Sequence, residues 1–151
     1  MQTTVLTPLS IAVGGAIGTL LRYYTGLLMM GWSQKLPWAT IFINTTGSFA
    51  IAFFGILTVA GARFPVSNEM RLIFMVGICG GYTTFSSFSL QTLDLLRNGA
   101  PGRAFMNVAL SLLFGLGAVT AGYLCATSIN NRQHAPALAA PMDRPAAQEK
   151  N

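Results

Sequence analysis

Charged side chains are scarce in this sequence. Of its 151 residues, 9 are Lys or Arg and 4 are Asp or Glu, so 9% are charged, whereas soluble domains contain about 25%. Four stretches contain no charge at all, namely residues 1–21, 36–62, 72–93 and 104–131. A membrane-spanning helix needs about 20 mostly apolar residues, and a surface helix of a soluble bundle would carry a charged face. The sequence therefore predicts an all-α membrane protein with four transmembrane helices.

Side chains that usually build enzyme or metal sites are nearly absent. The single histidine, His134, lies in a polar tail without a cysteine or carboxylate beside it, so neither a catalytic triad nor a zinc site is predicted. Cys79 and Cys125 form no CxxC pair, and we interpret both as small buried apolar residues. The basic residues are isolated rather than gathered into a stripe, which argues against a nucleic-acid partner. An enzyme is not expected.

The predicted spans form one transmembrane domain over residues 1–130. They cover residues 5–30, 38–60, 69–98 and 103–128. The composition then changes to Ala, Pro, Gln and scattered charge, so residues 131–151 are predicted to be a disordered tail.

The basic residues that flank the spans show no bias between the two sides of the membrane. The side of the termini would carry Arg63, Arg71 and Arg132, and the opposite side Lys35, Arg97 and Arg103. Because an excess of Lys and Arg sets orientation, a chain without it should insert both ways. A four-helix unit of 16.1 kDa is also small to enclose a polar path by itself. We therefore expect dual topology and an antiparallel homodimer in the lipid bilayer.

Polar residues inside the first two spans are candidates for packing or for function. Gly14, Gly18 and Arg22 follow one another at intervals of four, which places them on one helix face. The glycines are typical of close helix packing. Arg22 should face protein, carbonyls or an aqueous vestibule, as a structural or vestibule charge. Asn44 in the second span could join helices or line a path for a polar solute.

The third span contains the most informative segment. Gly77, Gly80 and Gly81 precede Thr83, and this run predicts a helix broken in the middle of the membrane, with freed carbonyls as cation ligands. The rings of Phe85 and Phe88, three residues apart, should project from one face just after the break. They could pack against lipid or core, or they could present positively polarised ring edges to an anion.

Acidic residues are missing from the interior of the spans. Glu69 lies at a helix start, and Asp94 is spaced to pair with Arg97 near the end of the third span. A proton-coupled exporter of cationic drugs would need a carboxylate inside the membrane. That absence argues against an exporter, and a non-transporting packing subunit would leave the polar break unexplained.

The motifs in all four spans together resemble the Fluc (CrcB) family of fluoride channels. The resemblance rests on Gly14-Gly15-Ala16-Ile17-Gly18 with Arg22-Tyr23, on Asn44 before Gly47-Ser48-Phe49, on Gly80-Gly81-Tyr82-Thr83-Thr84-Phe85-Ser86-Ser87-Phe88, and on Asn107. It covers residues 5–128 in order. It implies a fluoride-selective channel in a bacterial inner membrane that lets fluoride leave the cell down its electrochemical gradient and lowers its toxicity.

The resemblance also implies roles for individual residues. An antiparallel homodimer would contain two pores and one structural sodium ion, held by the backbone carbonyls of Gly80 and Thr83. Asn44, Phe85 and Phe88 would face the anion, and Asn107 and Ser111 would form a polar track on the fourth helix. One turn beyond Ser111 stands Gly115, where some members of the family have another hydroxyl. The alternatives are a small dual-topology multidrug exporter and a non-transporting membrane packing subunit.

Overall fold

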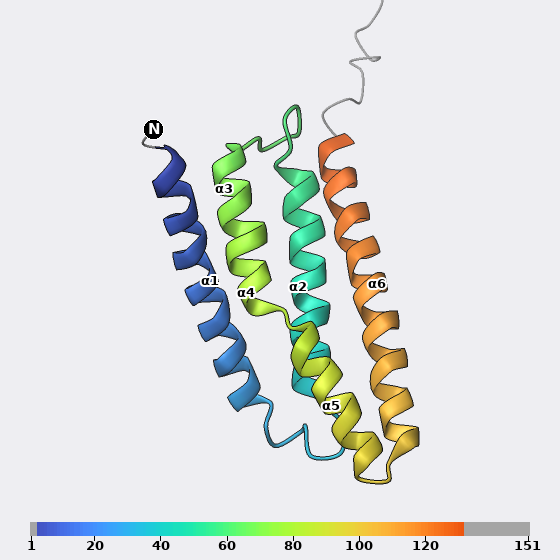
Figure 1. Ribbon diagram of the computed structural model, residues 1–151. Coiled ribbons are helices and arrows are strands. Elements are labelled where there is room, and N and C mark those ends of the chain that lie inside the picture. The colour runs from blue at the N-terminus through green and yellow to red at the C-terminus, as the bar shows by residue number, and fades with distance from the viewer. Residues whose placement is uncertain (1–2, 132–151) are drawn as a thin grey trace, which may run out of the picture.

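A computed structural model describes residues 3–131, which form a bundle made of helices (Figure 1). The elements are α1 (Thr3–Leu28), α2 (Trp38–Leu57), α3 (Asn68–Leu72), η1 (Ile73–Cys79, a π-helix), α4 (Gly80–Tyr82), α5 (Phe85–Arg97) and α6 (Pro101–Asn131). The start of α1 and the end of α6 lie at the same end of the bundle (Figure 1). Apart from Asn131, the predicted tail lies outside the described residues, together with Arg132 and His134.

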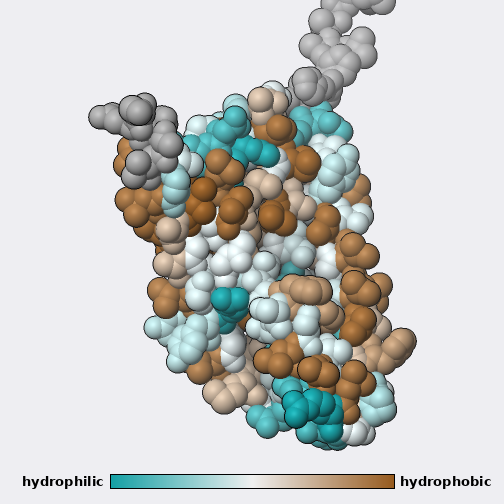
Figure 2. All heavy atoms as spheres, in the orientation of Figure 1, coloured by the Kyte–Doolittle hydropathy of each residue, from teal (hydrophilic) through white to brown (hydrophobic). Residues whose placement is uncertain are grey.

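Four helical segments are long and apolar enough to cross a membrane. They are Leu6–Leu28, Trp38–Leu57, Asn68–Arg97 and Pro101–Asn131, so the predicted number of spans is confirmed. On the face shown in Figure 2, hydrophobic residues lie along the length of the bundle and hydrophilic residues gather mainly at its two ends. This distribution matches an apolar band between two aqueous faces.

The helix boundaries differ from the predicted ones by up to three residues, and local backbone chemistry accounts for the start of the fourth span. The fourth span begins at Pro101 rather than at residue 103, since proline is well suited to the first position of a helix. Gly99 just before it has a φ of 70°, a conformation that glycine adopts without strain. The second span ends at Leu57 rather than at residue 60.

The end of α2 is fixed by polar side chains from two other spans. The Arg71 guanidinium donates to the carbonyl of Gly55 at 2.6 Å and to the Thr58 hydroxyl at 2.9 Å. Asn130 donates from its amide to the carbonyl of Ile56 at 3.0 Å. The last carbonyls of a helix have no partner within the helix, so these bonds stabilise α2 where it ends.

Helix α1 packs against the third span at backbone contact distance through glycines. A Cβ atom at Gly14 would lie 2.8 Å from the carbonyl oxygen of Ile73, and one at Gly77 would lie 2.9 Å from that of Ile11. A Cβ at Gly18 would collide with the Ile78 carbonyl. The packing interpretation of the first glycine pair is confirmed.

The third span contributes a second glycine pair at the same spacing, Gly77 and Gly81, to its contact with α1. A Cβ at Gly81 would collide with the carbonyl of Gly15. Both glycines lie in helical segments, and the helical conformation ends directly after Tyr82, one residue beyond Gly81. The glycines before the predicted break thus also serve to pack the third span against α1.

The two cysteines differ in their surroundings. Cys79 is buried at the end of η1, whereas Cys125 is exposed on α6. The interpretation of Cys125 as a buried residue is therefore wrong, because this residue lies on an outer face of its helix.

Between α4 and α5 the third span loses its helical conformation for two residues. Thr83 has a ψ of 157°, and Thr84 has φ and ψ of −152° and 110°. The extended segment shifts the chain sideways, so η1 and α4 pack against α1 whereas α5 packs against α6 (Figure 1). This displacement leaves a groove beside the extended segment.

Candidate functional site

Asn44 on α2 holds the backbone of Thr84 in the extended segment. Its Oδ1 accepts a hydrogen bond from the Thr84 N–H at 2.8 Å, and its Nδ2 donates to the Thr84 carbonyl at 3.1 Å. In a continuous helix the Thr84 N–H would bond to the carbonyl of Gly80 four residues earlier. Within residues 3–131 that carbonyl has no such donor.

Thr84 also caps the N-terminus of α5. Its hydroxyl oxygen accepts from the backbone N–H of Ser87 at 3.2 Å and donates to the Ser87 hydroxyl at 3.0 Å. A threonine cap satisfies one of the free N–H groups at a helix start. Asn44 and this cap together determine where α5 begins.

A groove with a volume of about 410 Å³ lies beside the extended segment. None of its lining side chains is charged. The structure brings six of the predicted site residues together here: Asn44, Gly80, Thr83, Phe85, Phe88 and Ser111. Gly115 lines the same groove one turn beyond Ser111. Its wall thus combines an amide, hydroxyls, phenyl rings and backbone from three spans.

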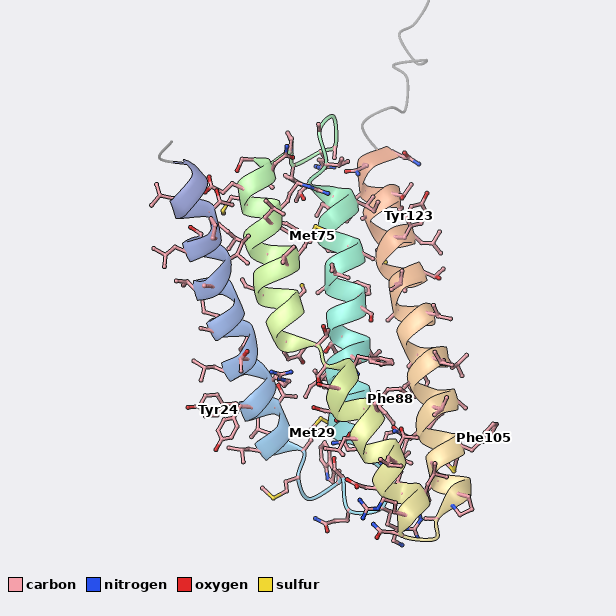
Figure 3. All side chains as sticks on the ribbon, viewed as in Figure 1. Tyr24, Met29, Met75, Phe88, Phe105 and Tyr123 are labelled. Atoms are coloured by element: carbon pink, nitrogen blue, oxygen red, sulfur yellow. The ribbon has the colours of Figure 1, made fainter. Side chains whose placement is uncertain are left out.

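Phe85 and Phe88 lie on one face of α5, as their spacing predicts. Their ring centroids are 5.6 Å apart with the planes tilted by 45°. The Phe85 side chain is 79% exposed in the single chain, whereas Phe88 is partly covered (Figure 3). The edge of a phenyl ring carries positive partial charge, so this pair can offer polarised C–H groups to an anion.

Arg22 reaches the same segment from α1. Its guanidinium donates to the carbonyl oxygen of Thr83 at 3.5 Å, a long and therefore weak hydrogen bond. Arg22 therefore meets a carbonyl, which is one of the three surroundings expected for it. Gly80 is exposed, and a Cβ atom there would lie 3.9 Å from its nearest neighbour, the Met75 carbonyl.

Asn107 lies next to the groove but is not among its lining residues. Its side chain is completely buried, and its Nδ2 donates to Thr92 Oγ1 on α5 at 2.8 Å. Its Oδ1 and the Ser111 hydroxyl are both buried and have no hydrogen-bond partner in the structure. The sequence argument did not single out Thr92, although its position one turn after Phe88 places both on one face.

The expected ion pair between Asp94 and Arg97 is not formed. No hydrogen bond or ion pair joins the two side chains in the described part of the chain, where both lie near the exposed end of α5. Across residues 3–131, no group of three or more His, Cys, Asp or Glu side chains could hold a metal ion.

Known proteins that resemble this chain match most of the residues that the structure describes. Residues 9–123 match the family described as CrcB-like protein, Camphor Resistance (CrcB). The fluoride-specific ion channel FluC of Gluconobacter oxydans is 57% identical over 125 residues, which cover 82% of this chain and 87% of the relative. That of Methylobacterium radiotolerans is 56% identical over 120 residues, covering 80% and 84%. The FluC of Thermus thermophilus is 45% identical over 116 residues, covering 76% and 90%.

Proposed function

Because the chain belongs to the CrcB-like protein family, we propose that it is a fluoride-selective channel. The observation that carries the proposal is the uncharged groove beside Thr84, where Asn44, Phe85 and Phe88 meet. The relatives are named as ion channels rather than as enzymes, and no residue is assigned a catalytic role. The four apolar helices make it a multi-pass membrane protein.

The groove has the chemistry that a small, strongly hydrated anion requires. A pore must replace water with hydrogen-bond donors and positive dipole ends, yet bind weakly enough to release the ion. Phenyl edges and hydroxyl groups provide partial charges, whereas a cationic side chain would hold the anion too tightly. The Asn44 amide uses one N–H on Thr84, which leaves its second N–H for a ligand.

The direction of transport follows from passive flow. A bacterial inner membrane has a negative interior, and moving one charge across it releases about 2.3 kcal/mol per 100 mV. An anion channel in that membrane lets fluoride leave the cell down its electrochemical gradient, which lowers cytoplasmic toxicity.

An antiparallel homodimer completes the groove. In the single chain Phe85 is exposed and α5 buries none of its residues, so the polar path remains open on one side. A second copy related by a two-fold axis in the membrane plane would cover this face and give two equivalent pores. The equal numbers of basic residues on the two sides support insertion in both orientations.

The carbonyls of Gly80 and Thr83 are the proposed ligands of one structural sodium ion at the dimer centre. The Gly80 carbonyl has lost its helical donor to Asn44, and the Thr83 carbonyl accepts only the weak bond from Arg22 among the described residues. Hard cations prefer oxygen ligands of this kind. The ion would add a fixed positive charge near the anion path.

Purified protein in liposomes tests the proposal. Fluoride efflux should be rapid, whereas chloride efflux, measured in the same vesicles, should stay at the background of protein-free liposomes. Absence of fluoride efflux would leave the packing subunit as the better description. Exchange of a cationic drug for protons would favour the exporter instead.

A further inference from the structure

Helix α5 carries both groove phenylalanines but is poorly anchored by packing. None of its residues is buried, and its leucines at 90, 93 and 96 are exposed. Its first turn is tied to α2 through Thr84 and Asn44. Packing within one chain therefore leaves the distance between α5 and α6 weakly determined.

One side-chain hydrogen bond joins α5 to α6 in the described part of the chain. Asn107 donates from Nδ2 to Thr92 Oγ1 at 2.8 Å, and the Thr92 hydroxyl donates to the carbonyl of Phe88, also at 2.8 Å. The relay begins on α6 and ends on the peptide group of a groove residue. Each of its donors has a definite acceptor.

The position of this bond relates it to the groove. Phe88 and Thr92 are four residues apart on α5, and Asn107 and Ser111 are four residues apart on α6, so each pair shares a helix face. Phe88 and Ser111 both line the groove. The bond thus joins the two helices one turn away from the point where they form the groove wall.

The burial of Asn107 argues against a purely stabilising role. Its side chain is completely buried and its Oδ1 has no partner, and a buried polar atom left unpaired costs free energy. A leucine, which has the same branched arrangement of side-chain heavy atoms, would avoid that cost. The asparagine amide, unlike leucine, can donate a hydrogen bond to Thr92.

We propose that Thr92 and Asn107 are positioning residues, which set the distance between the Phe88 ring and the Ser111 hydroxyl without contacting the ion. This inference rests on the proposed function. The distance between the ring and the hydroxyl matters only if a small anion must touch both walls of the groove. A wider groove would admit larger anions with their water, so both the fluoride flux and the preference over chloride should fall.

Near-isosteric substitutions in the full-length protein test this inference. Thr92→Val and Asn107→Leu should each lower the fluoride flux per reconstituted dimer about tenfold, which corresponds to about 1.4 kcal/mol in the barrier to permeation, and should lower the fluoride-to-chloride flux ratio. The double variant should be no worse than the stronger single variant, because both remove the same bond. Thr92→Ser, which keeps the hydroxyl, should leave both the fluoride flux and the fluoride-to-chloride flux ratio near their wild-type values. Thr120→Val is the matched control, since its hydroxyl donates only to the Leu116 carbonyl on an exposed face.

A second readout needs no transport. With 4-fluorophenylalanine incorporated only at position 88, the 19F resonance should shift in Thr92→Val and in Asn107→Leu and should be unchanged in Thr120→Val. An unchanged resonance in the first two variants would overturn the inference even if the channel conducts fluoride. Multiplicative effects in the double variant would overturn it too. A wild-type protein that moves no fluoride would instead refute the proposed function, and the resonance would still judge the positioning role.

Discussion

Asn44 and Thr84, which are forty residues apart in the sequence, are joined by two hydrogen bonds between the side-chain amide of Asn44 and the backbone N–H and carbonyl of Thr84. The pair replaces the helical bond that the Thr84 N–H would otherwise make. Asn44 therefore joins two spans and also lines the groove. The two interpretations of this residue that the sequence left open are compatible.

Substitution of Asn44 should separate its two contributions. Asn44→Leu leaves the Thr84 N–H unpaired, at about 1–3 kcal/mol, and removes the second donor from the Thr84 carbonyl, which as the N-cap carbonyl keeps the first helical bond of α5. Both thermal stability in detergent and fluoride efflux should therefore fall. Asn44→Asp retains an acceptor for the N–H but adds a negative charge, which repels an anion. Its efflux should fall further than its melting temperature explains. If Asn44→Leu melts like the wild type, the bonds to Thr84 do not hold the segment.

The Arg71 side chain should matter for stability rather than for conduction. Arg71→Met keeps much of the apolar stem but removes the bonds to the Gly55 carbonyl and to Thr58. Hydrogen bonds to charged groups contribute about 1.5–3 kcal/mol, so the melting temperature should fall clearly, whereas the flux per folded dimer should stay near the wild-type value. Arg103→Gln, at an exposed position, is the control and should melt normally. Equal melting of both variants would contradict this assignment.

The sequence predicted the spans well because length and the absence of charge decide them locally. Contacts between distant segments could not be predicted in the same way. The role of Gly77 and Gly81 depends on the carbonyls of α1 that they meet, and nothing adjacent to them in the sequence reveals that contact. A pair of glycines before a run of threonines therefore suggested a break rather than a packing surface.

Thr92 was overlooked for a related reason. A threonine in a membrane helix usually bonds to its own backbone, and Thr92 does so with Phe88. Its second bond comes from Asn107 on another helix, so its importance depends on the crossing of α5 and α6. Asn107 itself was assigned to the polar track by resemblance, whereas in the structure it faces Thr92.

The glycine contact between α1 and the third span can be tested with one methyl group. A Cβ atom at Gly18 meets the Ile78 carbonyl, whereas nothing lies within 4 Å of one at Gly26 on the same helix. Gly→Ala favours a helix by about 1 kcal/mol, but forcing extra volume into a packed contact costs about 1–3 kcal/mol. Gly18→Ala should therefore lower the melting temperature and Gly26→Ala should not. The reverse order would show that α1 does not pack through this face.

Gly80 provides a test of the second copy. In the single chain a Cβ atom there would come no closer than 3.9 Å to a neighbour, the Met75 carbonyl, and the backbone of Gly80 is helical, so Gly80→Ala should leave the helical content unchanged. If two copies meet at this residue around a cation, the methyl group should weaken the dimer. Light scattering in detergent should then show dissociation at protein concentrations where the wild type is dimeric. A Gly80→Ala dimer as tight as the wild type would place the two-fold contact elsewhere.

The phenyl rings of the groove distinguish an anion path from simple packing. Phe88→Ile keeps an apolar side chain but removes the polarised ring edge. If Phe88 only packs, the change should cost about 1–1.5 kcal/mol of stability and leave transport nearly intact. If its edge faces the ion, fluoride efflux should fall by far more than the loss of folded protein explains, in a variant that still elutes as a dimer. Phe105→Ile is the matched control, because that ring is 74% exposed on α6 and does not line the groove. Equal efflux from Phe88→Ile, Phe105→Ile and the wild type would remove Phe88 from the anion path, since the same substitution would then have the same effect inside the groove and outside it.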